Sequence, residues 1–220
     1  MKIKKISPFF YIVFGFLSIV LLGTILLKLP IAVQEGQHIN WIDALFTATS
    51  AVCVTGLTVF DVASTLSVFG KVVIAVLMQI GVLGIVSVVI FIVIMIGGRI
   101  GIGNRILIKE ALNQNSTQGM VRLIQKIFII AFAIELVALI VFFTIFIREF
   151  EFWQALGHSA FHAISSFNNA GFDILGGNSL ASYQNNLALL FTTTIFIIAG
   201  GLGFIVLFDI FEKKKYRKLS

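Results

Sequence analysis

Long apolar runs separated by shorter, more polar segments dominate this chain. Four runs are long enough to cross a bilayer as helices, at residues 9–27, 72–98, 127–147 and 187–208, because a hydrocarbon core of ~30 Å takes about 20 helical residues. A shorter, moderately apolar stretch lies between the first and second runs and another between the third and fourth, at residues 41–54 and 152–167. Stretches of this length are typical of re-entrant or interfacial helices. The pattern predicts a long helix, a half-length helix and a long helix, repeated twice.

The two halves of the chain also match in sequence. Residues 46–51 align with residues 161–166 at an offset of 115 positions, and at the same offset Gly56 falls on Gly171. The apolar runs that follow share a Gly-x-Leu-Gly pattern, which ends at Gly84 in the first half and at Gly203 in the second, with four extra residues in the second half. The sequence therefore predicts two tandem repeats, residues 1–110 and 111–220.

Composition and charge place these repeats in a membrane. Hydrophobic residues make up 59% of the chain and charged residues only 12%, which leaves too little polar surface for a soluble domain. Thirteen of the 16 Lys and Arg residues lie within residues 2–5, 99–126 and 213–218. Clusters of this kind beside apolar runs follow the positive-inside rule and do not indicate a nucleic-acid partner. We expect an all-α protein that crosses the lipid bilayer of the cell membrane several times. Both termini should be cytoplasmic, and the two repeats should have the same orientation in the membrane.

Each half-length stretch is followed by a loop with the features of a cation site. A desolvated cation needs oxygen ligands, which backbone carbonyls supply when several loops surround one axis. Glycine allows the left-handed backbone angles and close approach that such loops require, and a helix that ends just before the loop directs partial negative charge at the ion. The predicted ion-binding residues are Val54, Thr55 and Gly56 in the first loop and Asn169, Ala170 and Gly171 in the second.

These motifs resemble those of a known transporter superfamily. Residues 51–58 (AVCVTGLT) and 165–173 (SSFNNAGFD) are similar to the first and second filter loops of the Trk/Ktr/HKT potassium transporters, and residues 79–84 (QIGVLG) and 200–204 (GGLGF) to the helices that follow those loops. The bacterial Ktr membrane subunit resembles this chain most. The resemblance implies helix–pore-helix–helix (M1-P-M2) repeats around a pseudo-fourfold pore, with one filter glycine per repeat at Gly56 and Gly171. Val82 stands where the family usually has a second glycine.

The resemblance also implies function and partners. It implies potassium uptake, with sodium as coupling ion in some members, no further cofactor and no enzymatic role. Members of the superfamily carry four repeats, so this chain would be the N-terminal half of a transporter or would pair with a second copy to close the pore. The implied assembly is a homodimer gated by a cytoplasmic, nucleotide-binding ring subunit, for which residues 113–119 are a candidate docking loop. The alternative is a non-conducting structural or regulatory half that assembles with a complete transporter.

Several further residues have two interpretations. We assign Gly81, Gly84, Gly200, Gly201 and Gly203 to helix packing. Glu135, inside an apolar run, is either functional or simply hydrogen-bonded to a neighbouring helix. His158 and His162 lack a third ligand for a metal, so we expect them hydrogen-bonded at the outer mouth and no metal other than K⁺. Asp61 and Asp173 either attract cations or are solvated loop charges.

Overall fold

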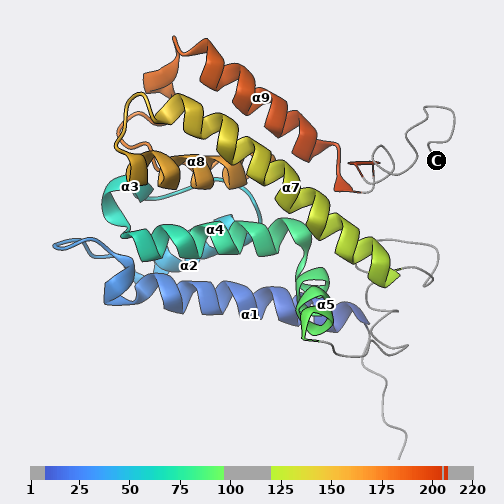
Figure 1. Cartoon of the computed structure of the whole chain (residues 1–220). Helices are drawn as coiled ribbons and strands as arrows, with labels where there is room; N and C mark the ends of the chain where they lie inside the picture. Colours follow the sequence, from blue (N-terminus) through green and yellow to red (C-terminus); the bar gives the residue numbers. More distant parts are fainter. Residues whose placement is uncertain (1–7, 97–119, 205, 208–220) are drawn as a thin grey trace, which may run out of the picture.

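The described part of the chain is built from helices and connecting loops. The computed structural model describes residues 8–96, 120–204, 206 and 207 (Figure 1). Within these ranges no strand forms, and Val33 and Leu66 make an isolated antiparallel bridge. The predicted all-helical class is therefore confirmed for this part of the chain. The candidate docking loop 113–119 and both terminal basic clusters lie outside the described residues.

The helices follow one another in a similar order in the first half (residues 8–96) and the second half (residues 120–207). The first half contains α1 (Pro8–Lys28), η1 (Pro30–Ala32), α2 (Trp41–Val52), α3 (Val62–Thr65), α4 (Val68–Leu83) and α5 (Ile85–Met95). The second half contains α7 (Met120–Phe146), α8 (Phe152–Phe167), η2 (Ser179–Tyr183) and α9 (Leu187–Gly201). Helices α2 and α8 are the two half-length helices that the sequence predicts.

Side-chain caps in the loops determine where three of the helices begin. The Asp61 carboxylate accepts a hydrogen bond from the Ala63 amide at the start of α3, and the Ser67 hydroxyl accepts one from Gly70 at the start of α4. The Asn186 side chain accepts a hydrogen bond from the Leu189 amide at the start of α9. Each cap satisfies an amide that has no partner within its own helix.

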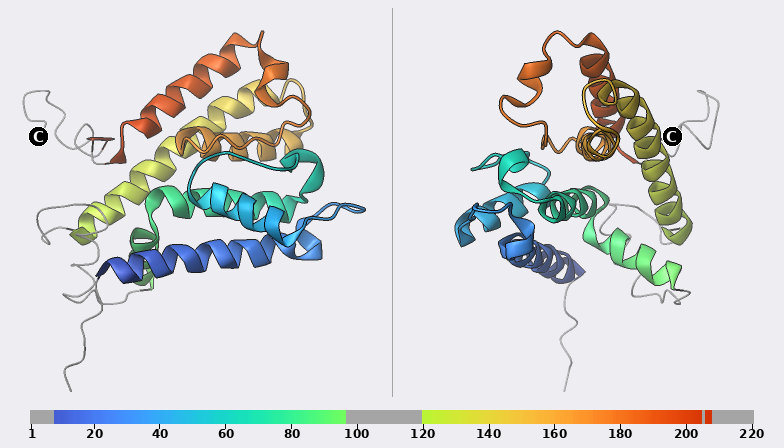
Figure 2. Two further views of the ribbon diagram at one scale, coloured as in Figure 1. Left: turned by 180° about the vertical axis from the view of Figure 1, so that it is seen from behind. Right: turned by 60° about the vertical axis from the view of Figure 1, so that its left-hand side comes forward.

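Small residues allow α2 and α8 to pack closely against helices on either side of them in the sequence. Helix α2 contacts α1 and α4, and helix α8 contacts α7 and α9; the two views in Figure 2 show α2 and α8 beside these partners. Ala44, Ala48 and Ala51 of α2 are completely buried. On α8, the buried Ala155 and Ala163 belong to the same apolar cluster as the α7 and α9 side chains.

The predicted long helices at residues 72–98 and 187–208 are not continuous, which corrects the sequence interpretation. Gly84 ends α4 and begins α5 with a φ of +75°, and the two helices are bent by 100°. Gly203, its equivalent in the repeat, has a φ of +80° just after α9. No atom lies within 4 Å of a Cβ built on either glycine. These two glycines therefore serve to break the helix, and the assignment to helix packing was wrong for them.

The packing assignment holds for the other glycine pair of the repeat. A Cβ on Gly81 would lie 2.1 Å from the Val52 carbonyl oxygen, and one on Gly200 would lie 1.7 Å from that of Phe167. Both carbonyls belong to the last residue of a half-length helix. A Cβ on Gly201 would make only an ordinary 3.6 Å contact with the Asn169 side chain, so close packing does not require glycine there.

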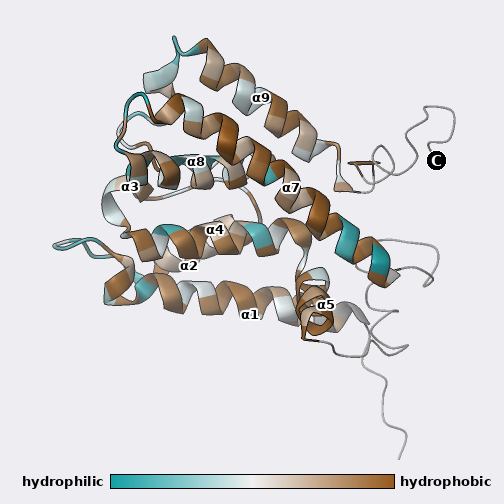
Figure 3. Ribbon diagram, viewed as in Figure 1, coloured by the Kyte–Doolittle hydropathy of each residue, from teal (hydrophilic) through white to brown (hydrophobic). Residues whose placement is uncertain are grey.

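Length and composition identify one described helix that could cross a membrane by itself. That helix is Val121–Phe146, and Val68–Leu83 with Ile85–Met95 would form a second only if the bent pair counts as one span. The apolar helices Ile12–Lys28 and Leu187–Gly201 are shorter. Apolar residues make up most of the length of the helices in Figure 3.

Candidate cation site

The two loops that follow the half-length helices have the same backbone conformation. In the first loop Val54 has a φ of +57° and Gly56 a φ of +73°; in the second loop Asn169 has a φ of +56° and Gly171 a φ of +72°. Both pairs are related by the 115-residue offset of the sequence repeat. A positive φ at a β-branched valine is a rare and unfavourable conformation. The left-handed angles predicted for Gly56 and Gly171 are thus observed, and the residue two positions before each glycine is left-handed in both loops as well.

Equivalent serines hold the two loops against their helices. The Thr55 amide donates to the Ser50 carbonyl at 2.9 Å, and the Ala170 amide donates to the Ser165 carbonyl at 2.8 Å. The Ser50 hydroxyl accepts the Leu57 amide at 2.9 Å, whereas the Ser165 hydroxyl donates to the Phe172 carbonyl. These serines fix the chain on both sides of each glycine.

The amide hydrogen bonds also determine where the preceding carbonyls point. In a planar trans peptide, the N–H of one residue and the C=O of the residue before it point in opposite directions. Because the Thr55 amide turns back toward Ser50, the Val54 carbonyl points away from α2. The same argument turns the Asn169 carbonyl away from α8. Both loops therefore present a carbonyl oxygen on the side opposite their supporting helix.

The two glycines bring the loops into direct backbone contact. A Cβ on Gly56 would lie 2.4 Å from the Ala170 carbonyl oxygen and 3.0 Å from the Gly171 Cα. A Cβ on Gly171 would lie 3.6 Å from the Gly56 Cα. No side chain fits at Gly56 without movement of the second loop. All six predicted ion-binding residues thus lie in two loops that meet at these glycines.

The acidic residues near the loops line a common hollow of about 350 Å³. The Asp61 carboxylate accepts hydrogen bonds from the Ala63 amide and the Ser64 hydroxyl, and the Asp173 carboxylate accepts them from the Leu175 amide and the Ser179 hydroxyl. Each carboxylate therefore stabilises its own turn. Their shared hollow keeps the cation-attracting interpretation open as well.

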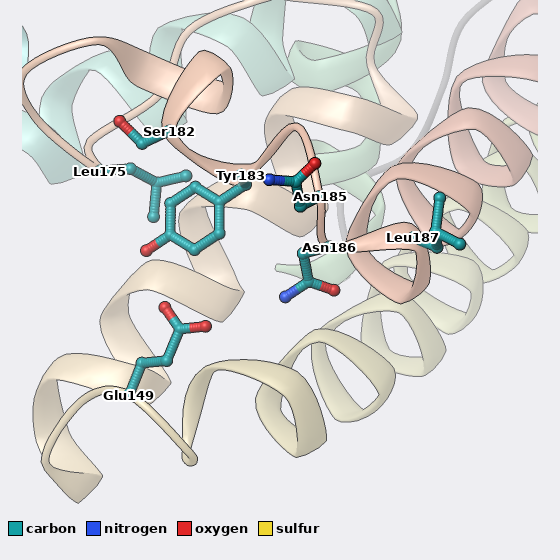
Figure 4. Close-up of a pocket in the computed structure, with 7 residues that line it drawn as sticks. All are labelled: Glu149, Leu175, Ser182, Tyr183, Asn185, Asn186 and Leu187. Atoms are coloured by element: carbon teal, nitrogen blue, oxygen red, sulfur yellow. The ribbon is translucent and has the colours of Figure 1, made fainter.

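A second hollow, of about 660 Å³, lies apart from the loops (Figure 4). None of the six predicted ion-binding residues lines it. Tyr183 points its hydroxyl toward Glu149 there. Partial burial raises the pKa of Tyr183 to about 12. The hydrogen bond to Glu149 and the negative charge of that carboxylate contribute to the same shift. Glu149 accepts a hydrogen bond from the Tyr183 hydroxyl, so this hollow contains a structural contact.

The two histidines of α8 pack against aromatic side chains of the second half. His162 is buried, its Nε2 lies 2.9 Å from the Thr193 hydroxyl, and its ring makes edge contacts with Phe142 and Phe146. His158 stacks obliquely on Phe150. The expected hydrogen bond is present for His162, and its ring is buried among the helices of the second half. Among the described residues, no group of three or more His, Cys, Asp or Glu side chains is placed to hold a metal.

Sequence analysis missed a buried polar cluster behind the second loop. The Asn168 side-chain amide donates to Gln79 of α4 at 2.7 Å and to Glu135 of α7 at 3.3 Å. Asn168 comes directly before the predicted ion-binding residues, and Gln79 is a polar residue inside an apolar run. Those two signals were present in the sequence, but only the fold shows that the three side chains meet.

Comparison with known proteins places this arrangement among the cation transport proteins. The chain matches the TrkH family of cation transport proteins over residues 8–220, and it belongs to that family. It is 38% identical to the Ktr system potassium uptake protein B of Bacillus subtilis (strain 168) over 219 residues, which cover 100% of this chain and 48% of that protein.

Two further relatives extend the comparison. The chain is 41% identical to the potassium/sodium uptake protein NtpJ of Enterococcus hirae over 217 residues, which cover 99% of this chain and 48% of NtpJ. It is 36% identical to the Ktr system potassium uptake protein B of Vibrio alginolyticus, with 91% of this chain and 44% of that protein covered. The chain thus spans about half the length of the curated relatives it matches. The family and these relatives are described as transport proteins, in agreement with the expectation that the chain is not an enzyme.

Proposed function

We propose that this chain forms two of the four quadrants of a potassium-conducting pore. The single observation that carries the proposal is the backbone contact between the loops at Gly56 and Gly171, each held behind by a serine of its short helix. Carbonyls arranged in this way can replace the hydration shell of a cation. Family membership and the names of the relatives support potassium as that cation.

The proposed ligands are the backbone oxygens of both loops. Thr55, Asn169 and Gly171 are exposed on the described chain, which leaves them accessible to two further quadrants. The partial negative charge at the C-terminal ends of α2 and α8 adds to the attraction for a cation. The proposed set is Val54, Thr55, Gly56, Asn169, Ala170 and Gly171.

The apolar surface of the long helices supports a position in the cell membrane. On α7, Ile129, Phe132, Leu136 and Ile140 are between 49% and 65% exposed. Apolar stripes of this extent on a monomer mark a lipid or protein interface. In the proposed arrangement, residues 1–110 and 111–220 are parallel M1-P-M2 repeats, both termini are cytoplasmic and the filter opens outward.

The remaining quadrants come from another polypeptide segment. A following half of the same protein or a second copy of this chain would supply them, because two loops cannot surround an ion. By family resemblance, the membrane unit is a homodimer with a cytoplasmic nucleotide-binding ring. Sodium is included as a coupling ion, and the name of the Enterococcus relative is compatible with this.

The test is growth of a potassium-uptake-deficient bacterium at low potassium. Two proteins are compared: this chain alone, and a chimera in which it replaces the aligned part of the Bacillus subtilis Ktr protein. We expect the chimera to restore growth, and the chain alone to do so only if two copies close a pore. A chimera that reaches the membrane but restores neither growth nor rubidium uptake would contradict the proposal and favour the non-conducting alternative.

A further inference from the structure

The second filter loop is attached to a buried polar cluster that joins both halves of the chain. The cluster consists of Gln79 on α4, Glu135 on α7 and Asn168 at the C-terminal end of α8. Glu135 is 6% exposed and Asn168 4%. The Asn168 amide group donates to the Gln79 oxygen at 2.7 Å and to the Glu135 carboxylate at 3.3 Å. A carboxylate in an apolar helix is costly to bury, so its partners determine what it does.

Asn168 is the residue through which this cluster reaches the loop. Its backbone amide donates to the Ile164 carbonyl at 3.0 Å and completes the last turn of α8. The next residue, Asn169, already has the left-handed conformation of the loop. Any movement of Asn168 would therefore shift the point at which the chain leaves the helix and enters the proposed ion site.

The first loop lacks an equivalent support. The 115-residue offset places Cys53 at the position of Asn168 and Val20 at the position of Glu135. Cys53 is exposed and Val20 is a buried apolar residue. Neither side chain can reproduce an amide–carboxylate hydrogen bond. The support is thus a property of the second loop alone.

The side chain of Asn169 strengthens this difference between the loops. Its two polar atoms lie 3.1 Å from the Ile197 carbonyl oxygen and 3.1 Å from the Gly201 amide nitrogen of α9. Val54, the equivalent residue in the first loop, has no polar side-chain atoms. Two consecutive asparagines therefore attach the second loop to three helices, α4, α7 and α9.

We infer that Glu135 is a positioning residue which, together with Gln79, holds Asn168 and thereby sets the cation selectivity of the second loop. The inference rests on the proposed function. Glu135 is buried, and its contact with the loop residues runs through the Asn168 amide group that donates to it. The carboxylate acts through the amide that it accepts.

The experiment measures potassium and sodium uptake by the growth-restoring chimera and its variants at equal membrane abundance. Glu135→Leu removes the acceptor, and we expect it to lower the potassium-over-sodium ratio about tenfold, which is equivalent to ~1.4 kcal/mol. Glu135→Gln keeps an oxygen that accepts from Asn168, so its ratio should stay within about twofold of the parent value. Ile140→Leu, on the same helix but exposed and outside the cluster, is the matched control and should leave the ratio unchanged.

A double-mutant comparison tests whether Glu135 acts through Asn168. We expect Glu135→Leu to have no further effect on the ratio once Asn168→Ala is present, because interacting residues are not additive. An unchanged ratio in Glu135→Leu would overturn the inference, as would an equal loss in Glu135→Gln, since that would show a requirement for charge. A chimera that transports no potassium at all would instead refute the proposed function.

Discussion

Gly56 and Gly171 lie in backbone contact although 115 positions separate them, and a Cβ on Gly56 would come within 2.4 Å of the carbonyl oxygen beside Gly171. Both residues have left-handed φ angles within 1° of one another. The contact therefore joins equivalent points of the two halves of the chain. The position of the proposed ion site follows from this relationship.

The serines behind the loops should maintain selectivity. Ser50→Ala would remove the oxygen that accepts the Leu57 amide at 2.9 Å, while the Thr55 hydroxyl would keep the Ser50 carbonyl as an acceptor. Loss of such a partner costs ~1–3 kcal/mol, so we expect the loop to relax and the potassium-over-sodium uptake ratio to fall about tenfold. Thr49→Ala is the control, since its hydroxyl donates only to the Leu45 carbonyl of its own helix. Equal ratios in the two variants would rule out this role for Ser50.

Neighbouring glycines on α9 should differ sharply in their tolerance of alanine. A Cβ on Gly200 would lie 1.7 Å from the Phe167 carbonyl oxygen, whereas one on Gly201 would make an ordinary 3.6 Å contact. Gly200→Ala should separate α9 from α8 and destabilise the protein by ~1–3 kcal/mol. Thermal unfolding of the purified proteins in detergent is the measurement, and a midpoint for Gly200→Ala no lower than that of Gly201→Ala would contradict the packing described.

The sequence predicted the repeated loops well, for a physical reason. A glycine that must have a positive φ at a close backbone contact cannot be replaced without strain. Both repeats therefore keep a glycine at this position, and Gly56 and Gly171 could be recognised from their offset of 115 residues. The helix break at Gly84 was missed because glycine in an apolar run is compatible with both close packing and a bend. The cluster around Asn168 was missed because its three members are far apart in sequence and only α4–α8 and α7–α8 packing brings them together.

The bend at Gly84 should depend on its backbone angle and not on the space around it. Gly84 and Gly157 both have open space at the Cβ position, but only Gly84 has a positive φ, of +75°. Gly84→Ala should cost ~1–2 kcal/mol and favour a straighter α4–α5 pair, while Gly157→Ala in the middle of α8 should be neutral or stabilising by ~0.4–1 kcal/mol. Distances between spin labels at the exposed Val72 and Val89 measure the bend. An unchanged distance in Gly84→Ala would show that other contacts hold the bend.

The acidic hollow outside the loops should affect cation capture and leave selectivity unchanged. Asp61→Asn and Asp173→Asn remove the charge but keep one side-chain oxygen to accept the backbone amide of each turn. If the charges concentrate cations, the double variant should raise the KM for potassium about twofold at low ionic strength, and the difference should disappear near 0.1 M salt, where screening acts over ~10 Å. A KM equal to that of the parent at low ionic strength would assign both residues to the turns alone.

The central claim is tested most directly by the potassium-over-sodium uptake ratio of Gly56→Ser in the growth-restoring chimera. Gly36→Ser is its control, because Gly36 also has a positive φ, of +78°, but no atom lies within 4 Å of its Cβ position. We predict that Gly56→Ser lowers the ratio at least about tenfold, an effect of ~1.4 kcal/mol, while Gly36→Ser leaves it unchanged. A Gly56→Ser protein that reaches the membrane and keeps the parent ratio would contradict the assignment of these loops as the ion site.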